Sequence, residues 1–147
     1  MNETRKLLET IVENARTGEY ACDQLLKKVE DEEMRRELER EKREYLAFSG
    51  EAEKRLEQMG LPIKHKDMMA RMGMWMGTQM NTMMDKTSTH IAEMLIEGAT
   101  MGVVEMTKAR NSFPEADAES HTIASRMITS QQDTIERLKH VLRLQEA

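Results

Sequence analysis

Apolar side chains recur along most of the chain at alternating steps of three and four residues, the spacing that places them on one face of a helix. The first such run covers residues 3–30. Its seam consists of Leu8, Ile11, Ala15, Gly18, Cys22, Leu25 and Val29. The pattern predicts a long amphipathic helix over this range.

A second helix is predicted over residues 32–59. Asp31 is a candidate N-cap, and acidic residues follow it in the first turn, where the helix dipole favours them. The helix is expected to stop at Gly60, which suits a left-handed cap, before Pro62, which cannot continue it. Its seam consists of Met34, Leu38, Tyr45, Phe48, Ala52, Leu56 and Met59.

Two more helices are predicted in the second half of the chain, over residues 87–110 and 114–145. Asp85, Thr87 and Ser88 can each cap the start of the third helix, and the fourth follows "NSFPEADAES" with acids at its start. Their inward positions are Ile91, Met94, Leu95, Gly98, Met101 and Gly102 in the third helix, and Ile123, Met127, Thr134, Leu138 and Val141 in the fourth.

Residues 61–86 are left as a long crossover between the second and third helices. A long second connection lets those two helices run parallel. We therefore predict an all-α fold: one domain over residues 1–147, a four-helix bundle with up-down-down-up directions. A continuous helix over residues 66–110 that protrudes from the bundle is the alternative.

Composition narrows the classes of function. The chain has 147 residues, 33% of them charged, and a formal net charge of -5, so no basic face is indicated and nucleic acid is excluded as the main partner. Cys22 is the single cysteine, which rules out an intramolecular disulfide and favours a cytoplasmic location. No signal peptide is expected, and no stretch approaches the roughly 20 apolar residues of a membrane span.

The helix lengths, the Gly18–Glu19 pair in the first helix and the position of the crossover resemble the ferritin-like superfamily, in particular small bacterial branches that include coat-protein-like members. The resemblance covers nearly the whole chain, through "ENARTGEYACDQLLKKVEDEEMRRELEREKREY" and "HIAEMLIEGATMGVVEMTKARNSF". It implies a bundle whose relatives hold two iron ions between the helices.

Metal binding is one hypothesis that follows from the resemblance. The di-iron pattern needs one glutamate from each of two helices and Glu-x-x-His from each of the other two. The matching positions are Glu19, Glu41, Glu44 and Glu97, with His90 as a further nitrogen ligand. The second helix lacks the histidine, and the fourth offers Ser130, Gln131 and Thr134 where ligands are needed. We therefore expect a mostly lost iron site.

The alternative is a polar layer without metal. Glu19, Tyr45, Gln131 and Thr134 would then hydrogen-bond to one another at mid-bundle, because an unpaired acid there would be costly. Cys22 on the same seam is expected to be a buried, inert thiol.

Eight methionines lie between residues 68 and 84. Several follow helical spacing and fit a crossover helix packed on the bundle, but others lie off that stripe and suggest a second apolar surface for a protein partner or a homodimer. A Cu(I) site is a further hypothesis, because thioethers are soft ligands and Trp75 lies within "MGMWM". The candidate partner-binding residues are Met72, Trp75, Met76, Met80 and Met83.

The function predicted from the sequence is non-catalytic: a structural or protein-interaction module that forms a homo-oligomer and needs no cofactor. The alternative is a metal-binding protein that stores or oxidises iron through the mid-bundle carboxylates, or that holds copper in the methionine-rich segment.

Overall fold

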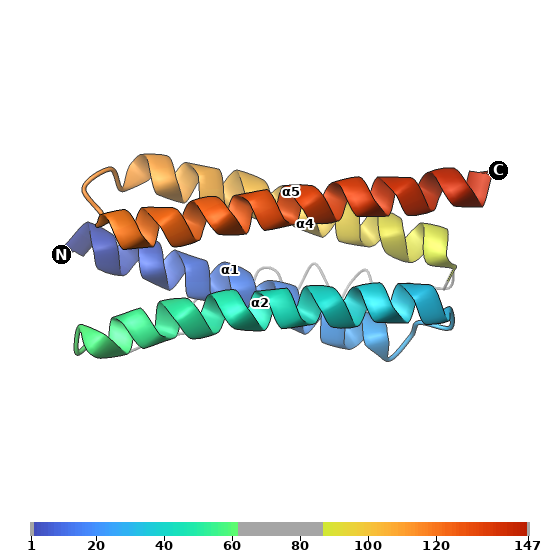
Figure 1. Ribbon diagram of the computed structural model, residues 1–147, viewed down its shortest axis with the longest axis horizontal. Coiled ribbons are helices and arrows are strands. Elements are labelled where there is room, and N and C mark those ends of the chain that lie inside the picture. Colours follow the sequence, from blue (N-terminus) through green and yellow to red (C-terminus); the bar gives the residue numbers. More distant parts are fainter. Residues whose placement is uncertain (1, 62–86, 147) are drawn as a thin grey trace.

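The computed structural model describes residues 2–61 and 87–146, and within them it has four helices and no strand: α1 (Asn2–Leu26), α2 (Glu32–Gln58), α4 (Ser88–Ser112) and α5 (Ala118–Glu146). The prediction of an all-α, four-helix protein is confirmed for this part of the chain. α1 and α2 form one hairpin, α4 and α5 form a second, and the two lie side by side (Figure 1). None of these helices is long and apolar enough to cross a membrane.

The predicted boundaries of α2 and α4 rest on caps that the structure contains. The Asp31 side chain accepts a hydrogen bond from the Met34 amide at 2.9 Å. Gly60 follows α2 with a φ of 71°, in the left-handed region. The Thr87 hydroxyl accepts from the His90 amide at 3.3 Å, and the Thr87 backbone is extended. The helix therefore begins at Ser88, and a continuous helix over residues 66–110 is excluded.

Two predicted boundaries were wrong by four residues. α1 ends at Leu26 rather than at residue 30, although Val29 is buried in the connection that follows and so prolongs the apolar pattern beyond the helix. α5 begins at Ala118 rather than at residue 114, because Asp117 is the residue that caps it and accepts from the Ser120 amide at 2.9 Å. Neither shift changes which side chains face inward.

Ionic contacts follow the line where α2 meets α5. They join Glu37 to Arg137 at 3.1 Å, Glu51 to Arg126 at 2.8 Å and Arg55 to Asp117 at 3.0 Å. Because the partners run in opposite order along the two helices, α2 and α5 are antiparallel. α4 is also antiparallel to α5, so α2 and α4 point the same way (Figure 1).

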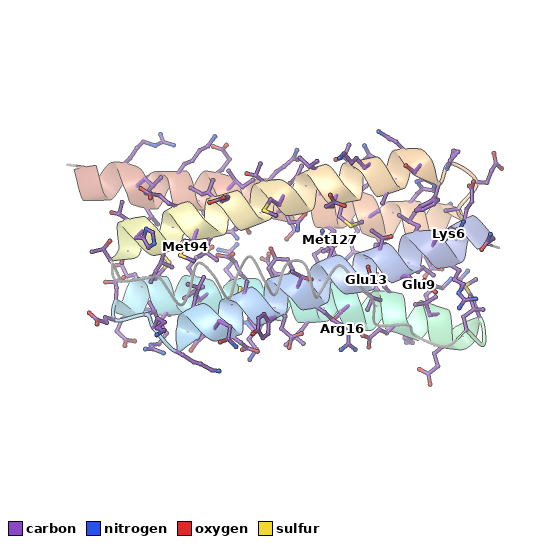
Figure 2. The ribbon with its side chains drawn as sticks, turned by 180° about the vertical axis from the view of Figure 1, so that it is seen from behind. Lys6, Glu9, Glu13, Arg16, Met94 and Met127 are labelled. Carbon is purple, nitrogen blue, oxygen red and sulfur yellow. The ribbon has the colours of Figure 1, made fainter. Side chains whose placement is uncertain are left out.

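The buried core is divided into two apolar clusters along the length of the bundle. One cluster, which includes Leu8, Leu56 and Met127, fills the end where α1 begins. The other, which includes Leu38 and Met94, fills the end where α1 finishes. Met94 of α4 and Met127 of α5 lie between the two hairpins in the side-chain view (Figure 2). Apolar packing near each end thus stabilises the bundle, and polar residues can be accommodated between the two clusters.

Leu38→Ala is expected to lower the free energy of unfolding by about 2–5 kcal/mol, because it leaves a hole in a fully buried cluster. Leu46→Ala on the same helix is the matched control, since Leu46 is 44% exposed and its truncation should change stability by less than about 0.5 kcal/mol. Urea denaturation followed by circular dichroism measures both. Equal losses would contradict the assignment of Leu38 to the core.

Candidate functional site

A cavity of about 430 Å³ opens between α1 and α4 near the middle of the bundle. Leu25, Met94 and Leu95 give it apolar walls on one side, and its lining reaches α2 and α5 at Glu41, Tyr45 and Gln131. The volume falls within the range of small-molecule sites, about 300–1,000 Å³. This hollow, apolar with a few polar groups, is the candidate site.

Two glycines make room for the bulky polar side chains around the cavity. A Cβ at Gly18 of α1 would overlap the ring of Tyr45 from α2, and a Cβ at Gly102 of α4 would come within 2.9 Å of Cδ of Gln131 from α5. A methyl group cannot be accommodated at such contacts unless the neighbour moves. Each hairpin therefore uses a glycine on its first helix to admit a large polar side chain from its second.

The side chains admitted in this way form a polar network that joins the two hairpins. Gln131 Nε2 donates to Asn14 Oδ1 at 3.0 Å, and Asn14 Nδ2 makes a longer contact of 3.5 Å to the Gly102 carbonyl oxygen. The Tyr45 hydroxyl is also hydrogen-bonded to the Gln131 side chain. The predicted polar layer is present at Tyr45 and Gln131.

The other two predicted members of that layer are placed differently. The Thr134 hydroxyl is buried but accepts from Arg137 Nη2 at 3.0 Å. Glu19 is only half-buried and is not among the residues that line the cavity. Asn14 takes part in the layer instead, and it was not predicted.

Glu41 is the most unusual residue of the site. It is only 2% exposed, it lines the cavity, and its Oε2 has no hydrogen-bond partner among the described residues. A buried acceptor without a donor costs about 1–3 kcal/mol. Oε1 of Gln131, which is 4% exposed, is likewise without a partner in that part of the chain. Two residues of the lining therefore each contain a buried oxygen without a hydrogen-bond donor among the described residues.

Burial disfavours the charged forms of three ionisable groups in the cavity, Glu41, Cys22 and Tyr45. Desolvation raises the pKa of the Glu41 carboxyl well above its usual range, and Glu37, whose side chain is hydrogen-bonded to it, raises that pKa further. Desolvation also raises the pKa values of the Cys22 thiol and the Tyr45 hydroxyl, with smaller contributions from nearby acids. Burial therefore favours the neutral forms of a carboxyl, a thiol and a phenol in the lining.

The structure brings few of the predicted metal ligands together. Glu44 accepts from the Ser130 hydroxyl at 2.7 Å and lies 3.5 Å from Arg40, outside the cavity. Glu97 is exposed on α4, and His90 lies in the first turn of that helix, with its Nδ1 3.9 Å from Glu93. Among residues 2–61 and 87–146, no group of three or more metal-binding side chains is found.

The donor set at mid-bundle does not fit a two-iron centre. Two hard cations need several converging carboxylates and imidazoles. Of the predicted ligands Glu19, Glu41, Glu44, His90 and Glu97, only Glu41 lines the cavity.

The methionine-rich predictions concern residues outside those that the structure describes. Met72, Trp75, Met76, Met80 and Met83 all lie there. The copper site, the homodimer and the protein partner proposed for that segment therefore stay predictions.

The glycine–bulky residue pairs were the feature that sequence reasoning missed. Gly18, Gly102 and Tyr45 were assigned to inward seams and Gln131 to a mid-bundle polar layer, but their pairing within each hairpin was not inferred. The sequence signal for such a pair is a glycine at a seam position where a larger apolar side chain is expected. Such a glycine implies that a side chain from another helix fills the space beside it.

No protein family, curated protein or solved structure matches the chain in comparisons with known proteins.

Gly18→Ala is expected to lower the free energy of unfolding by about 1–3 kcal/mol, because the new methyl group displaces the Tyr45 ring. Gly50→Ala on α2 is the control, since no atom lies within 4 Å of a Cβ there. It should stabilise the protein by about 0.5–1 kcal/mol through helix propensity. Thermal and urea unfolding measure both, and stabilisation by both variants would contradict the close approach at Gly18.

The raised pKa of Glu41 predicts a loss of stability as pH rises. Above the unfolded-state value near 4.5, the folded protein holds a proton that the unfolded chain has released, so the free energy of unfolding falls until the pH reaches the folded-state pKa. Glu41→Gln should flatten this fall above about pH 5. Glu39→Gln on the exposed side of α2 should leave it unchanged. Parallel slopes in the wild type and Glu41→Gln would show that the carboxyl ionises normally.

Proposed function

We propose that the protein is a non-catalytic helical bundle that binds a small, mainly apolar molecule in the mid-bundle cavity. The observation that carries the proposal is a cavity of ligand size lined by Glu41, whose buried Oε2 has no partner among the described residues. Buried polar atoms are almost always paired in folded proteins. A molecule bound in the cavity would supply the hydrogen-bond donor that the Glu41 oxygen lacks.

Binding rather than catalysis is supported by the protonation of the lining. Acid–base sites hold groups whose environments push their pKa values apart. Here burial raises the pKa values of Cys22, Glu41 and Tyr45 together, toward neutral forms. A thiol with a raised pKa is a poor nucleophile, and no histidine of the described residues lines the cavity.

The ferritin-like assignment is kept as part of the proposal. The parallel α2 and α4, separated by a long connection, support it. The cavity lies between the helices of the bundle, where bundle proteins build their ligand and metal sites. In this chain that space would serve an organic ligand instead of a pair of metal ions.

A protein-interaction module is the second candidate. Tyr20 and Val104 are 43% and 45% exposed and lie at the cavity mouth on α1 and α4, where they offer apolar surface to a partner. Such a module would not depend on the interior of the cavity, and this difference separates the two candidates.

A cavity-filling variant tests the proposal. Gly98 borders the cavity, and a Cβ there meets no atom within 4 Å, so Gly98→Leu is expected to fill the space. N-phenyl-1-naphthylamine, an uncharged fluorescent probe, should bind the wild type saturably at a single site. Gly98→Leu should weaken it at least about tenfold, the equivalent of about 1.4 kcal/mol. Gly50→Leu, on the exposed face of α2, is the matched control and should bind as the wild type does.

Two results would contradict the proposal. One is binding that does not saturate. The other is saturable binding that Gly98→Leu leaves intact, which would place the probe elsewhere on the molecule and favour the interaction module.

A further inference from the structure

We infer that the molecule held in the cavity is a small organic ammonium ion with an apolar body, whose N–H groups donate to Glu41 and Gln131. The inference rests on the proposed function and adds the chemical class of the ligand.

Two residues that line the cavity, Glu41 and Gln131, each have a buried oxygen that lacks a hydrogen-bond donor among the described residues. Glu41 Oε2 and Gln131 Oε1 are both acceptors without partners among the described residues. The nearby amide donors are already engaged, since Gln131 Nε2 donates to Asn14 and Asn14 Nδ2 to the Gly102 carbonyl. An ammonium group has only donors to offer. It therefore complements the ionised Glu41 carboxylate and the Gln131 amide oxygen, whereas an anionic ligand would place oxygen against oxygen once Glu41 is ionised.

The charges around the cavity favour a cation. Glu41 faces Glu37 and Glu44 on its own helix and Cys22 on α1. Arg137 of α5 is the cation nearby, and it is paired with Glu37 at 3.1 Å. On α4, Glu105 lies at the cavity mouth, and no lysine or arginine of residues 2–61 and 87–146 is part of the lining. Opposite charges attract strongly where water is excluded, so the acids Glu37, Glu44 and Glu105 near this site favour a cation over an anion.

The other residues of the cavity lining indicate the chemistry of the part of the ligand that carries the ammonium group. Leu25, Met94 and Leu95 supply aliphatic surface, and Met side chains adapt to irregular shapes. The Tyr45 ring also borders the cavity, and an aromatic ring attracts a cation placed over its face. A compact hydrocarbon group next to a single ammonium matches both features.

Binding of an ammonium ion has a proton balance that can be measured. In the free protein burial raises the pKa of Glu41 and so favours its protonated form. When R–NH₃⁺ binds, the Glu41 carboxyl gives its proton to the solvent and becomes the carboxylate that pairs with the ligand. One proton is released for each ammonium bound, and no covalent bond changes. A neutral ligand of the same shape releases none.

Isothermal titration calorimetry with three related probes tests the inference. Benzylamine, which is protonated at neutral pH, supplies the cation, benzyl alcohol is the neutral control, and phenylacetate is the anion. Benzylamine should bind at least about tenfold more tightly than benzyl alcohol, and phenylacetate should not bind. Repeating the benzylamine titration in buffers of different ionisation enthalpy should give a release of about one proton.

Two matched variants assign the effect to one carboxyl. Glu41→Gln should weaken benzylamine at least about tenfold and abolish proton release, while benzyl alcohol keeps its affinity. Glu39→Gln removes an exposed acid of the same helix that is not part of the cavity lining. It should leave all three probes unchanged.

The outcomes separate this inference from the proposed function. Equal binding of benzylamine and benzyl alcohol, both weakened by Gly98→Leu, would overturn the ammonium assignment and leave the cavity as a ligand site. Tight benzylamine binding that survives Glu41→Gln would also overturn it. Failure of N-phenyl-1-naphthylamine and of all three probes to bind would overturn the proposed function itself.

Discussion

The close approach of two large polar side chains to two glycines is the constraint on which the middle of the bundle depends. The Tyr45 ring occupies the space beside Gly18, and the Gln131 amide occupies the space beside Gly102. The two side chains meet where the hairpins are in contact, and there Gln131 bonds both to Tyr45 and to Asn14. A polar layer then lies between the two apolar clusters.

This arrangement leaves a cavity whose lining is mainly apolar and includes one buried carboxyl group. Gly98 and Gly102 of α4 line the cavity and have no side chains that would extend into it. On α2 the lining includes the Glu41 carboxyl, whose pKa burial raises. An unpaired buried acceptor lowers stability. Proteins tolerate such local losses at sites that serve function, because the surrounding core compensates for them. The apolar clusters at the two ends provide that compensation here.

Much of the fold could be predicted from the sequence, because apolar spacing and capping residues act locally. Asp31 and Gly60 were predicted at the two ends of α2, Thr87 was one of three candidate caps for α4, and the structure has all three residues at those helix ends. The predicted start of α5 was too early because Asp117, and not the segment around Pro114, caps it. At the site, Tyr45 and Gln131 were expected in a polar layer, and Glu41 was expected on the seam, although as a metal ligand. The cavity and the part played by Asn14 could not be predicted, because they depend on the relative height and rotation of helices from different hairpins.

The most direct test of this account is an NMR titration of the Glu41 side-chain carboxyl carbon in the ligand-free protein, assigned by its absence in Glu41→Gln. Burial of this carboxyl, whose Oε2 has no partner among the described residues, predicts a titration midpoint well above 4.5. A midpoint near 4.5 would mean that the carboxylate is solvated or paired, and it would remove the reason for assigning a ligand to the cavity.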